Sequence, residues 1–185
     1  DPIGSRGLGD VYKRQGNMWV KWIRRLEFGD KPYMTREETS KYTDLLRDGK
    51  ARMFTWVMEA KSVVTSPSPE KPILHKGIQQ LRGLAWSGKG KIKRVDVSLD
   101  GGKNWRTAQL HAPIMPKSLV RFTFPFEWSG EELLIQSRAI DETGYVQPYI
   151  QELQKIRGKN SIYHNNSIAT WLVSKSGKVD NVRLG

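Results

Sequence analysis

The segment 83–105 constrains the fold more than any other part of the chain, because it has the pattern of a strand, a tight turn and the start of a second strand. Apolar and polar side chains alternate along its middle: Val95, Val97 and Leu99 with Arg94, Asp96 and Ser98. A period of two is typical of a strand with one buried and one wet face. Asp100-Gly101-Gly102 accepts positive φ, and Trp105 is expected to re-enter an apolar layer. The pattern predicts a hairpin of a β-sandwich.

Turn residues divide most of the remaining chain into short apolar segments. The candidate strands are residues 53–64, 79–86, 92–99, 105–109, 120–126, 133–140 and 170–174. Prolines at 67 and 69 end the first of these, because proline cannot donate to a ladder. Several short strands at this spacing predict an all-β, immunoglobulin-like sandwich. Phe122, Phe124 and Phe126 alternate within one strand and form a candidate core or interface stripe.

The first fifty residues have a different character. Residues 1–15 include four glycines or prolines and resemble translated sequencing-adapter sequence. We expect a non-native tail there, and a natural disordered terminus is the alternative. Residues 19–26 are apolar and basic, which predicts a compact strand. Residues 29–51 are polar, and the capping-box pattern at 35–38 predicts the start of a short helix.

Composition and charge exclude several classes of protein. The 185 residues include 31 Lys and Arg against 19 Asp and Glu, which gives a net charge of +12. The basic residues are scattered singly and lack interleaved aromatic residues, so we expect no nucleic-acid partner. The positive electrostatic field that this net charge produces is expected to attract small anions instead. No apolar run has membrane-spanning length, so no membrane span is expected. The chain has no cysteine, which excludes disulfides and thiolate ligands to a metal.

A search for catalytic motifs finds little. The three histidines, His75, His111 and His164, are far apart and lack metal-ligand spacing. The glycine-containing stretches 88–90 and 100–102 connect predicted strands, so they are interpreted as turns and not as phosphate-binding loops. No partner that could orient a nucleophile is evident near Ser161. The residues alone therefore predict a β-sandwich whose function is open, and a non-catalytic scaffold module is one alternative.

Several motifs, however, resemble the sulfite oxidase family of molybdopterin oxidoreductases. The blocks that carry this resemblance are 20–22, 83–105, and Arg157-Gly158 with Asn160 and His164. Further blocks resemble the sulfane dehydrogenase branch of that family: 34–42, 58–62, 141–148 and 157–164. The resemblance implies that residues 16–50 are the end of the molybdopterin-binding domain with a connecting segment. It implies that residues 51–185 are the immunoglobulin-like dimerisation domain.

This resemblance also implies an activity. Family members oxidise sulfur compounds at a molybdenum atom held by molybdopterin and a cysteine thiolate, and the electrons pass to a c-type cytochrome. The cysteine belongs to an N-terminal domain, so this chain is expected to be an inactive C-terminal fragment that holds no molybdenum alone. The parent is expected to be periplasmic and to form a homodimer, or a heterotetramer with the cytochrome subunit. A sulfite dehydrogenase of the same family is the nearest alternative to a sulfane dehydrogenase.

Individual site residues follow from the same resemblance. Lys21, with Val20, is expected beside the pterin and its phosphate, and Asn17 and Met18 in a neighbouring cofactor-contacting turn. An ammonium group among backbone N–H groups is suited to hold a phosphate. The alternative for Lys21 is a plain edge charge.

Two residues are expected to bind the sulfur substrate, a small oxyanion or sulfane. They are Tyr42, through its hydroxyl, and Arg157, whose guanidinium donates in a rigid fork. Asn160 and His164 are expected to lie next to these two residues and to hold them in place, without contacting the substrate themselves. An ordinary half-buried tyrosine is the alternative for Tyr42, and an arginine that bonds loop carbonyls before Gly158 is the alternative for Arg157.

Overall fold

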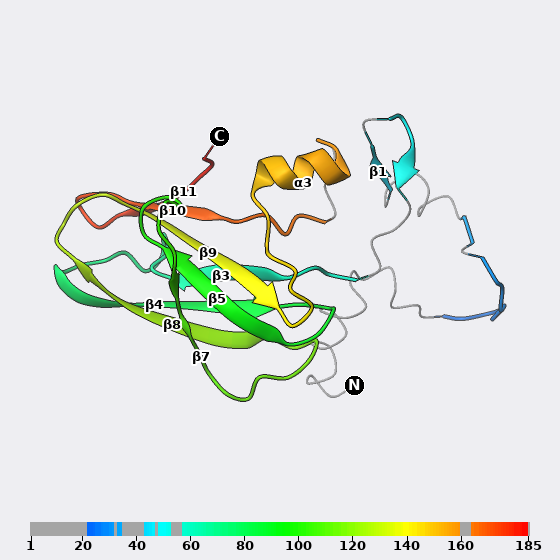
Figure 1. Ribbon diagram of the computed structural model, residues 1–185, viewed down its shortest axis with the longest axis horizontal. Helices are drawn as coiled ribbons and strands as arrows, with labels where there is room; N and C mark the ends of the chain where they lie inside the picture. Colours follow the sequence, from blue (N-terminus) through cyan, green and yellow to red (C-terminus); the bar gives the residue numbers. More distant parts are fainter. Residues whose placement is uncertain are drawn as a thin grey trace.

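The protein is a sandwich of two antiparallel sheets packed face to face (Figure 1), as seen in a computed structural model. The described residues are 22–31, 33–34, 43–46, 48–52, 57–159 and 164–184. One sheet has four strands in the order β3-β4-β8-β7, and the other has five in the order β11-β10-β9-β5-β6. This architecture confirms the predicted all-β sandwich class.

Most strands lie close to the segments predicted for them. The four-stranded sheet contains β3 (Lys61–Ser66), β4 (Gly77–Trp86), β7 (Gln109–Leu110) and β8 (Val120–Trp128). The five-stranded sheet contains β5 (Ile92–Ser98), β6 (Arg106–Thr107), β9 (Leu133–Asp141), β10 (Thr170–Val173) and β11 (Val179–Val182). The long pairings β4–β8 and β5–β9 form the centres of the two sheets.

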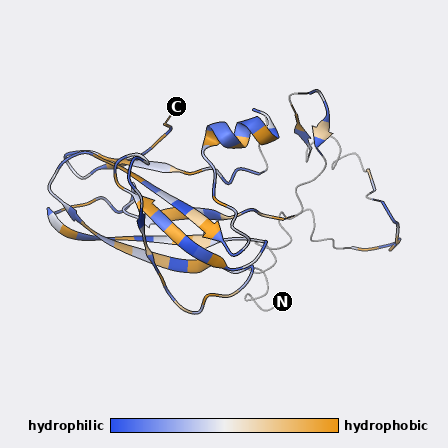
Figure 2. Cartoon of the chain, in the orientation of Figure 1, coloured by the Kyte–Doolittle hydropathy of each residue, from blue (hydrophilic) through white to orange (hydrophobic). Residues whose placement is uncertain are grey.

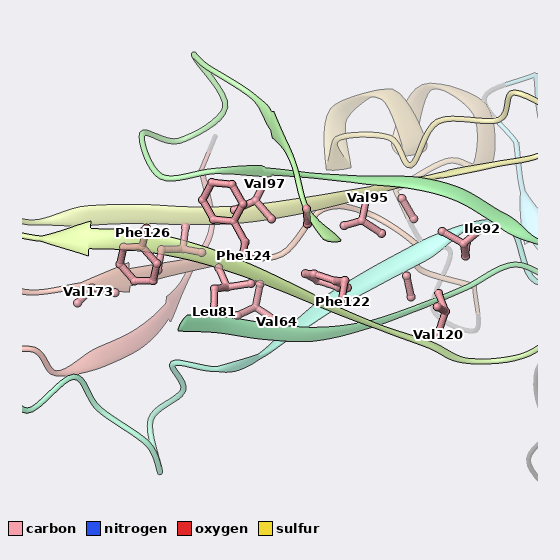
Figure 3. Packing of buried hydrophobic residues seen from close by; sticks show 14 of the residues in the cluster. Val64, Leu81, Ile92, Val95, Val97, Val120, Phe122, Phe124, Phe126 and Val173 are labelled. Atoms are coloured by element: carbon pink, nitrogen blue, oxygen red, sulfur yellow. The ribbon is translucent and has the colours of Figure 1, made fainter. Parts of the chain in front are cut away.

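Alternating side chains build the core between the sheets, and Figure 2 shows the alternation as bands of hydropathy along the strands. Phe122, Phe124 and Phe126 are all buried and point from β8 into this core (Figure 3). They meet residues of the facing sheet such as Val95 and Val97. The predicted phenylalanine stripe is therefore core.

One glycine is required by close packing within the four-stranded sheet. A Cβ on Gly83 would lie 2.1 Å from Cζ of Phe122 and 2.5 Å from the carbonyl oxygen of Val63. The Phe122 ring therefore packs directly against the β4 backbone at Gly83, and a side chain at position 83 would displace the ring.

The strand β5 departs from the prediction on its polar face. Val95 and Val97 are buried as predicted, but Asp96 and Ser98 are buried too. Asp96 accepts hydrogen bonds from Arg138 and Thr107, and Ser98 donates to Asp100. A buried polar group is stable when it is hydrogen-bonded, so this face is a covered polar layer at Asp96 and Ser98, and only Arg94 on it is exposed as predicted.

The turn after β5 also differs at its end. Gly101 and Gly102 have positive φ as predicted, with values of 75° and 92°. Trp105, however, does not join the hydrophobic core: its Nε1 donates to the Gly102 carbonyl, and its ring stacks on the guanidinium of Arg138 at 4.3 Å. The tryptophan closes the turn over the polar layer.

Other corrections concern element boundaries. The predicted strand 105–109 is divided into β6 and β7, which belong to different sheets, and the described part of 53–64 becomes a strand only at Lys61. Residues 22–26 are described and are not a strand, so that part of the predicted N-terminal strand is wrong. The helix predicted to begin at 35–38 lies outside the described residues.

Two of the elements that sequence analysis missed lie at one end of the sandwich: helix α3 (Ile150–Arg157) and the hairpin of β1 (Asp44–Leu45) and β2 (Ala51–Arg52). The third, β11, is the edge strand of the five-stranded sheet. Figure 1 shows α3 above the five-stranded sheet with β1 beyond its end. Gly158 ends the helix with φ 80°, and a Cβ there would lie 2.3 Å from the Leu45 carbonyl oxygen. This glycine lets the helix end approach the hairpin closely.

Two substitutions on β4 test the assignment of core and surface. Leu81→Ala removes a fully buried side chain and should lower the free energy of unfolding by about 2–5 kcal/mol. Ile78→Ala, on the same strand but 86% exposed, should change it by no more than about 0.5 kcal/mol. Urea unfolding of the two variants measures both, and equal losses would contradict the assignment.

Candidate functional site

Arg157, the last residue of α3, is the largest completely buried side chain among the described residues. Its Nη1 lies 3.2 Å from Oδ2 of Asp44, and its Nη2 lies 3.3 Å from Oε2 of Glu59. Asp44 belongs to β1 and Glu59 precedes β3, so one guanidinium bridges three parts of the chain. Burial of a charged group is tolerated when it is paired in this way.

Glu59 collects further donors at the same place. Oε2 accepts a hydrogen bond from the Tyr145 hydroxyl at 3.0 Å and lies 3.4 Å from Nε2 of His164. The Lys89 ammonium lies 3.6 Å from Oε1. We call these five residues, Glu59, Arg157, His164, Tyr145 and Lys89, the Glu59 cluster. Three groups from loops and one from the end of α3 thus converge on one carboxylate.

The antiparallel topology explains why these loops meet. Lys61, at the start of β3, pairs with Trp86 at the end of β4, and Ile92, at the start of β5, pairs with Asp141 at the end of β9. The residues just outside these pairs, Glu59, Lys89 and Tyr145, therefore emerge at the same end of the sandwich. Binding residues are often carried on loops held by such a rigid scaffold.

Secondary contacts fix the orientation of the cluster. Nδ2 of Asn166 donates to the Tyr145 hydroxyl oxygen at 3.0 Å and to the Ala60 carbonyl at 3.2 Å. The Lys89 ammonium lies 4.9 Å from the centroid of the Tyr145 ring, within the range of a cation–π contact. Tyr145 therefore supports both the carboxylate and the ammonium.

The protonation states follow from this geometry. Burial alone raises the pKa of Glu59, but hydrogen bonds from His164 and Tyr145 and the positive charge of Arg157 outweigh it and hold that pKa well below the ordinary range. Burial and the adjacent Glu59 charge raise the pKa of Tyr145 to about 12. At neutral pH the cluster therefore contains an ionised Glu59 and a neutral Tyr145 that donates to it.

The structure brings together two of the predicted site residues, Arg157 and His164, through a carboxylate that was not predicted. Both lie within hydrogen-bonding distance of Glu59. Arg157 pairs with two carboxylates, whereas the alternative considered in sequence analysis was bonding to loop carbonyls. The other predicted residues lie outside the described residues: Asn17, Met18, Val20, Lys21, Tyr42 and Asn160.

Sequence analysis missed Glu59, Asp44, Lys89 and Tyr145 as site residues. Glu59 and Tyr145 lie within the blocks 58–62 and 141–148 that carried the family resemblance, but no spacing pairs them with Arg157, which follows Glu59 by 98 residues. Lys89 lies in the glycine-flanked stretch that was interpreted only as a turn. A single charged residue beside a turn is too common to mark a site.

The donor set does not form a metal centre by itself. The chain has no cysteine, and the described residues contain no group of three or more His, Asp or Glu side chains that could hold a metal ion.

The described part of the chain also contains no helix with the length and apolar character needed to cross a membrane.

Comparison with known proteins identifies the family to which this domain belongs. A family model described as the Mo-co oxidoreductase dimerisation domain matches residues 52–171, which include Glu59, Arg157 and His164. The chain belongs to the Mo-co oxidoreductase dimerisation domain family. The predicted resemblance to this family is confirmed.

Relatives of this dimerisation domain include several oxidoreductases. Chicken sulfite oxidase is 32% identical over 143 residues, which cover 70% of this chain and 31% of the oxidase. Tobacco NADH nitrate reductase 2 is 31% identical over 166 residues, or 72% of this chain and 18% of the reductase. The chain therefore spans less than a third of the length of these two curated relatives.

A solved structure is similar over almost the whole chain. The crystal structure of the sulfane dehydrogenase SoxCD from Paracoccus pantotrophus is 60% identical, with a TM-score of 0.87. The match covers 92% of this chain and 44% of that chain.

The Glu59 carboxylate gives this dimerisation domain a predictable acid sensitivity. Its pKa is lowered on folding, so it contributes stability above the ordinary glutamate pKa of about 4.3 and loses that contribution as the pH falls. Between about pH 5 and pH 3 the wild type should lose stability more steeply than Glu59→Gln. Urea unfolding at several pH values measures this slope. The exposed Glu131→Gln should retain the wild-type slope, and an unchanged slope in Glu59→Gln would contradict the prediction.

Proposed function

We propose that this domain functions within a molybdopterin-dependent sulfur-compound dehydrogenase of the sulfane dehydrogenase type. In this proposal it provides the dimerisation surface and one wall of the substrate pocket. The observation that supports it most is the 60% identity to the sulfane dehydrogenase SoxCD, maintained over 92% of the chain. The parent is a periplasmic homodimer or a heterotetramer with a c-type cytochrome subunit that accepts the electrons.

The Glu59 cluster supports the proposal that the pocket wall lies at its end of the sandwich. It gathers Arg157, Lys89 and His164, all of which can carry positive charge, at one end of the sandwich. Such groups donate charge-assisted hydrogen bonds to sulfur oxyanions. In this proposal Arg157 and Tyr42 bind the substrate, and Asn160 and His164 support them.

The cofactor is molybdenum–molybdopterin, which supplies oxygen-transfer and electron-transfer chemistry to family members. The metal needs a thiolate that this cysteine-free chain does not provide. Asn17, Met18, Val20 and Lys21 are proposed to contact the pterin. The chain's own described residues are assigned only anion binding and orientation, with no step at the metal.

A sulfite dehydrogenase of the same family is the second candidate, and the 32% identity to chicken sulfite oxidase favours it. The enzyme isolated with its molybdenum distinguishes the two candidates. We expect it to reduce a c-type cytochrome with a higher kcat/KM for a sulfane-bearing substrate than for sulfite. A preference for sulfite supports the alternative, and an enzyme that oxidises neither refutes the proposal in favour of a scaffold module.

The role of Arg157 in substrate binding is tested in the same holoenzyme. Arg157→Met should lower kcat/KM about 10–100-fold, the equivalent of about 1.5–3 kcal/mol for one charge-assisted hydrogen bond. Arg157→Lys should restore only part of it, because an ammonium keeps the charge but loses the fork. Steady-state kinetics per bound molybdenum measures both. A loss of thermal stability with unchanged kcat/KM would show that Arg157 is only a brace.

Self-association is the last prediction from this proposal. Sedimentation of the holoenzyme at micromolar concentration should give a two-fold dimer, or a heterotetramer with the cytochrome. A strictly monomeric enzyme would contradict the proposed role of the domain.

A further inference from the structure

We propose that Glu59 is a positioning residue, whose carboxylate holds the Arg157 guanidinium in the orientation in which it meets the substrate anion. This inference rests on the proposed function, because it takes Arg157 as a substrate contact. Glu59 itself is assigned no contact with substrate and acts only through the groups that it binds.

The geometry around Arg157 supports this role. Asp44 holds Nη1 from the β1 side, and Glu59 holds Nη2 from the sandwich side. Two contacts on the two terminal nitrogens fix both the direction and the plane of a guanidinium. Because Glu59 precedes β3 of the rigid sandwich, it ties that plane to the scaffold and not only to the hairpin.

Charge balance explains why a carboxylate is needed at this position. Arg157 is 1% exposed, His164 is 5% exposed, and both lie within 3.4 Å of the same oxygen, Oε2 of Glu59. Lys89 approaches the other oxygen. Without the negative charge of Glu59, Arg157 and Lys89 would repel one another in a poorly solvated region, and His164 would add to this repulsion when protonated.

The carboxylate is also held rigidly enough to position other groups. Its Oε2 accepts from the Tyr145 hydroxyl, which in turn accepts from Asn166, and Asn166 is anchored to the Ala60 carbonyl. This chain of hydrogen bonds ends on the backbone at the residue next to Glu59. The carboxylate orientation is therefore set by the fold.

Simple electrostatics and positioning predict opposite effects for the substitution Glu59→Gln. Removing a negative charge close to an anion site strengthens anion binding by Coulomb attraction alone, so KM would fall. Losing the alignment of Arg157 weakens the fork that receives the anion, so KM would rise. The sign of the change in KM therefore separates the two accounts.

The first experiment measures kinetics of the molybdenum-loaded enzyme with the sulfur compound that wild type oxidises best. We expect Glu59→Gln to raise KM on the order of tenfold while kcat per molybdenum changes much less. Glu59→Asp keeps the charge with a shorter reach and should lie between the two. The matched control is Glu131→Gln, the same chemical change at an exposed ion pair, which should behave as wild type.

The second experiment needs no activity, so it separates this inference from the proposed function. In nitrogen-15 NMR spectra of the 185-residue chain, the Arg157 side-chain N–H signals should be resolved and slow to exchange with water. Glu59→Gln should broaden or lose them, and Glu131→Gln should not. If wild-type enzyme oxidises no sulfur compound, the proposed function fails while these signals still decide whether Glu59 fixes Arg157.

Either of two results would overturn the inference. One is a KM that falls or stays constant in Glu59→Gln, and the other is a set of Arg157 signals that the substitution leaves unchanged. If Glu59→Gln does not fold, Glu59→Asp takes its place in both experiments. A folded Glu59→Asp with wild-type KM and wild-type Arg157 signals then counts against the positioning role.

Discussion

A guanidinium removed from water needs compensating negative charge, and much of the arrangement at one end of this sandwich follows from that requirement at Arg157. Its two carboxylate partners, Asp44 and Glu59, precede it by 113 and 98 residues. To supply both, the chain must bring the first hairpin, the segment before β3 and the end of α3 to one point. Breaking such a buried pair costs more than its formation gains, because the remaining charge is left unpaired.

The sandwich provides the rigid support for this ion-pair network. Its core is continuous between the two sheets, and Phe122 lies so close to Gly83 that the ring and the β4 backbone are in direct contact. Close-packed interiors of this kind resist deformation. Lys89 lies between β4 and β5, Tyr145 follows the end of β9, and Glu59 precedes β3, so each of these residues is held close to a strand of the sandwich.

The relatives of this domain are parts of proteins with different named activities: a sulfite oxidase, a nitrate reductase and a sulfane dehydrogenase. A shared fold does not select among such activities, because the side chains of the site do. Under the proposed function, the Glu59 cluster is the part of this chain where differences in substrate should be sought. Lys89, 39% exposed at its side chain, is the cluster's most solvent-accessible cation.

The sequence by itself determined the sandwich, since the period-two alternation in β5 and β8 and the turn residues between the apolar segments depend only on neighbouring residues. It also identified the family through blocks such as 83–105, and it singled out Arg157 and His164. Short elements were less predictable: β11 and the β1–β2 hairpin have two to four residues per strand, too few for a periodic pattern to emerge.

Only the tertiary structure decided which residues surround Arg157 and which polar side chains are buried. Asp96 and Ser98 have the alternation of a wet face, yet the fold covers them and satisfies them with hydrogen bonds. Glu59 is one carboxylate among 19 acidic residues, and nothing local marks it. Its role arises from contacts across about a hundred residues, where chain topology and not sequence spacing sets the distance.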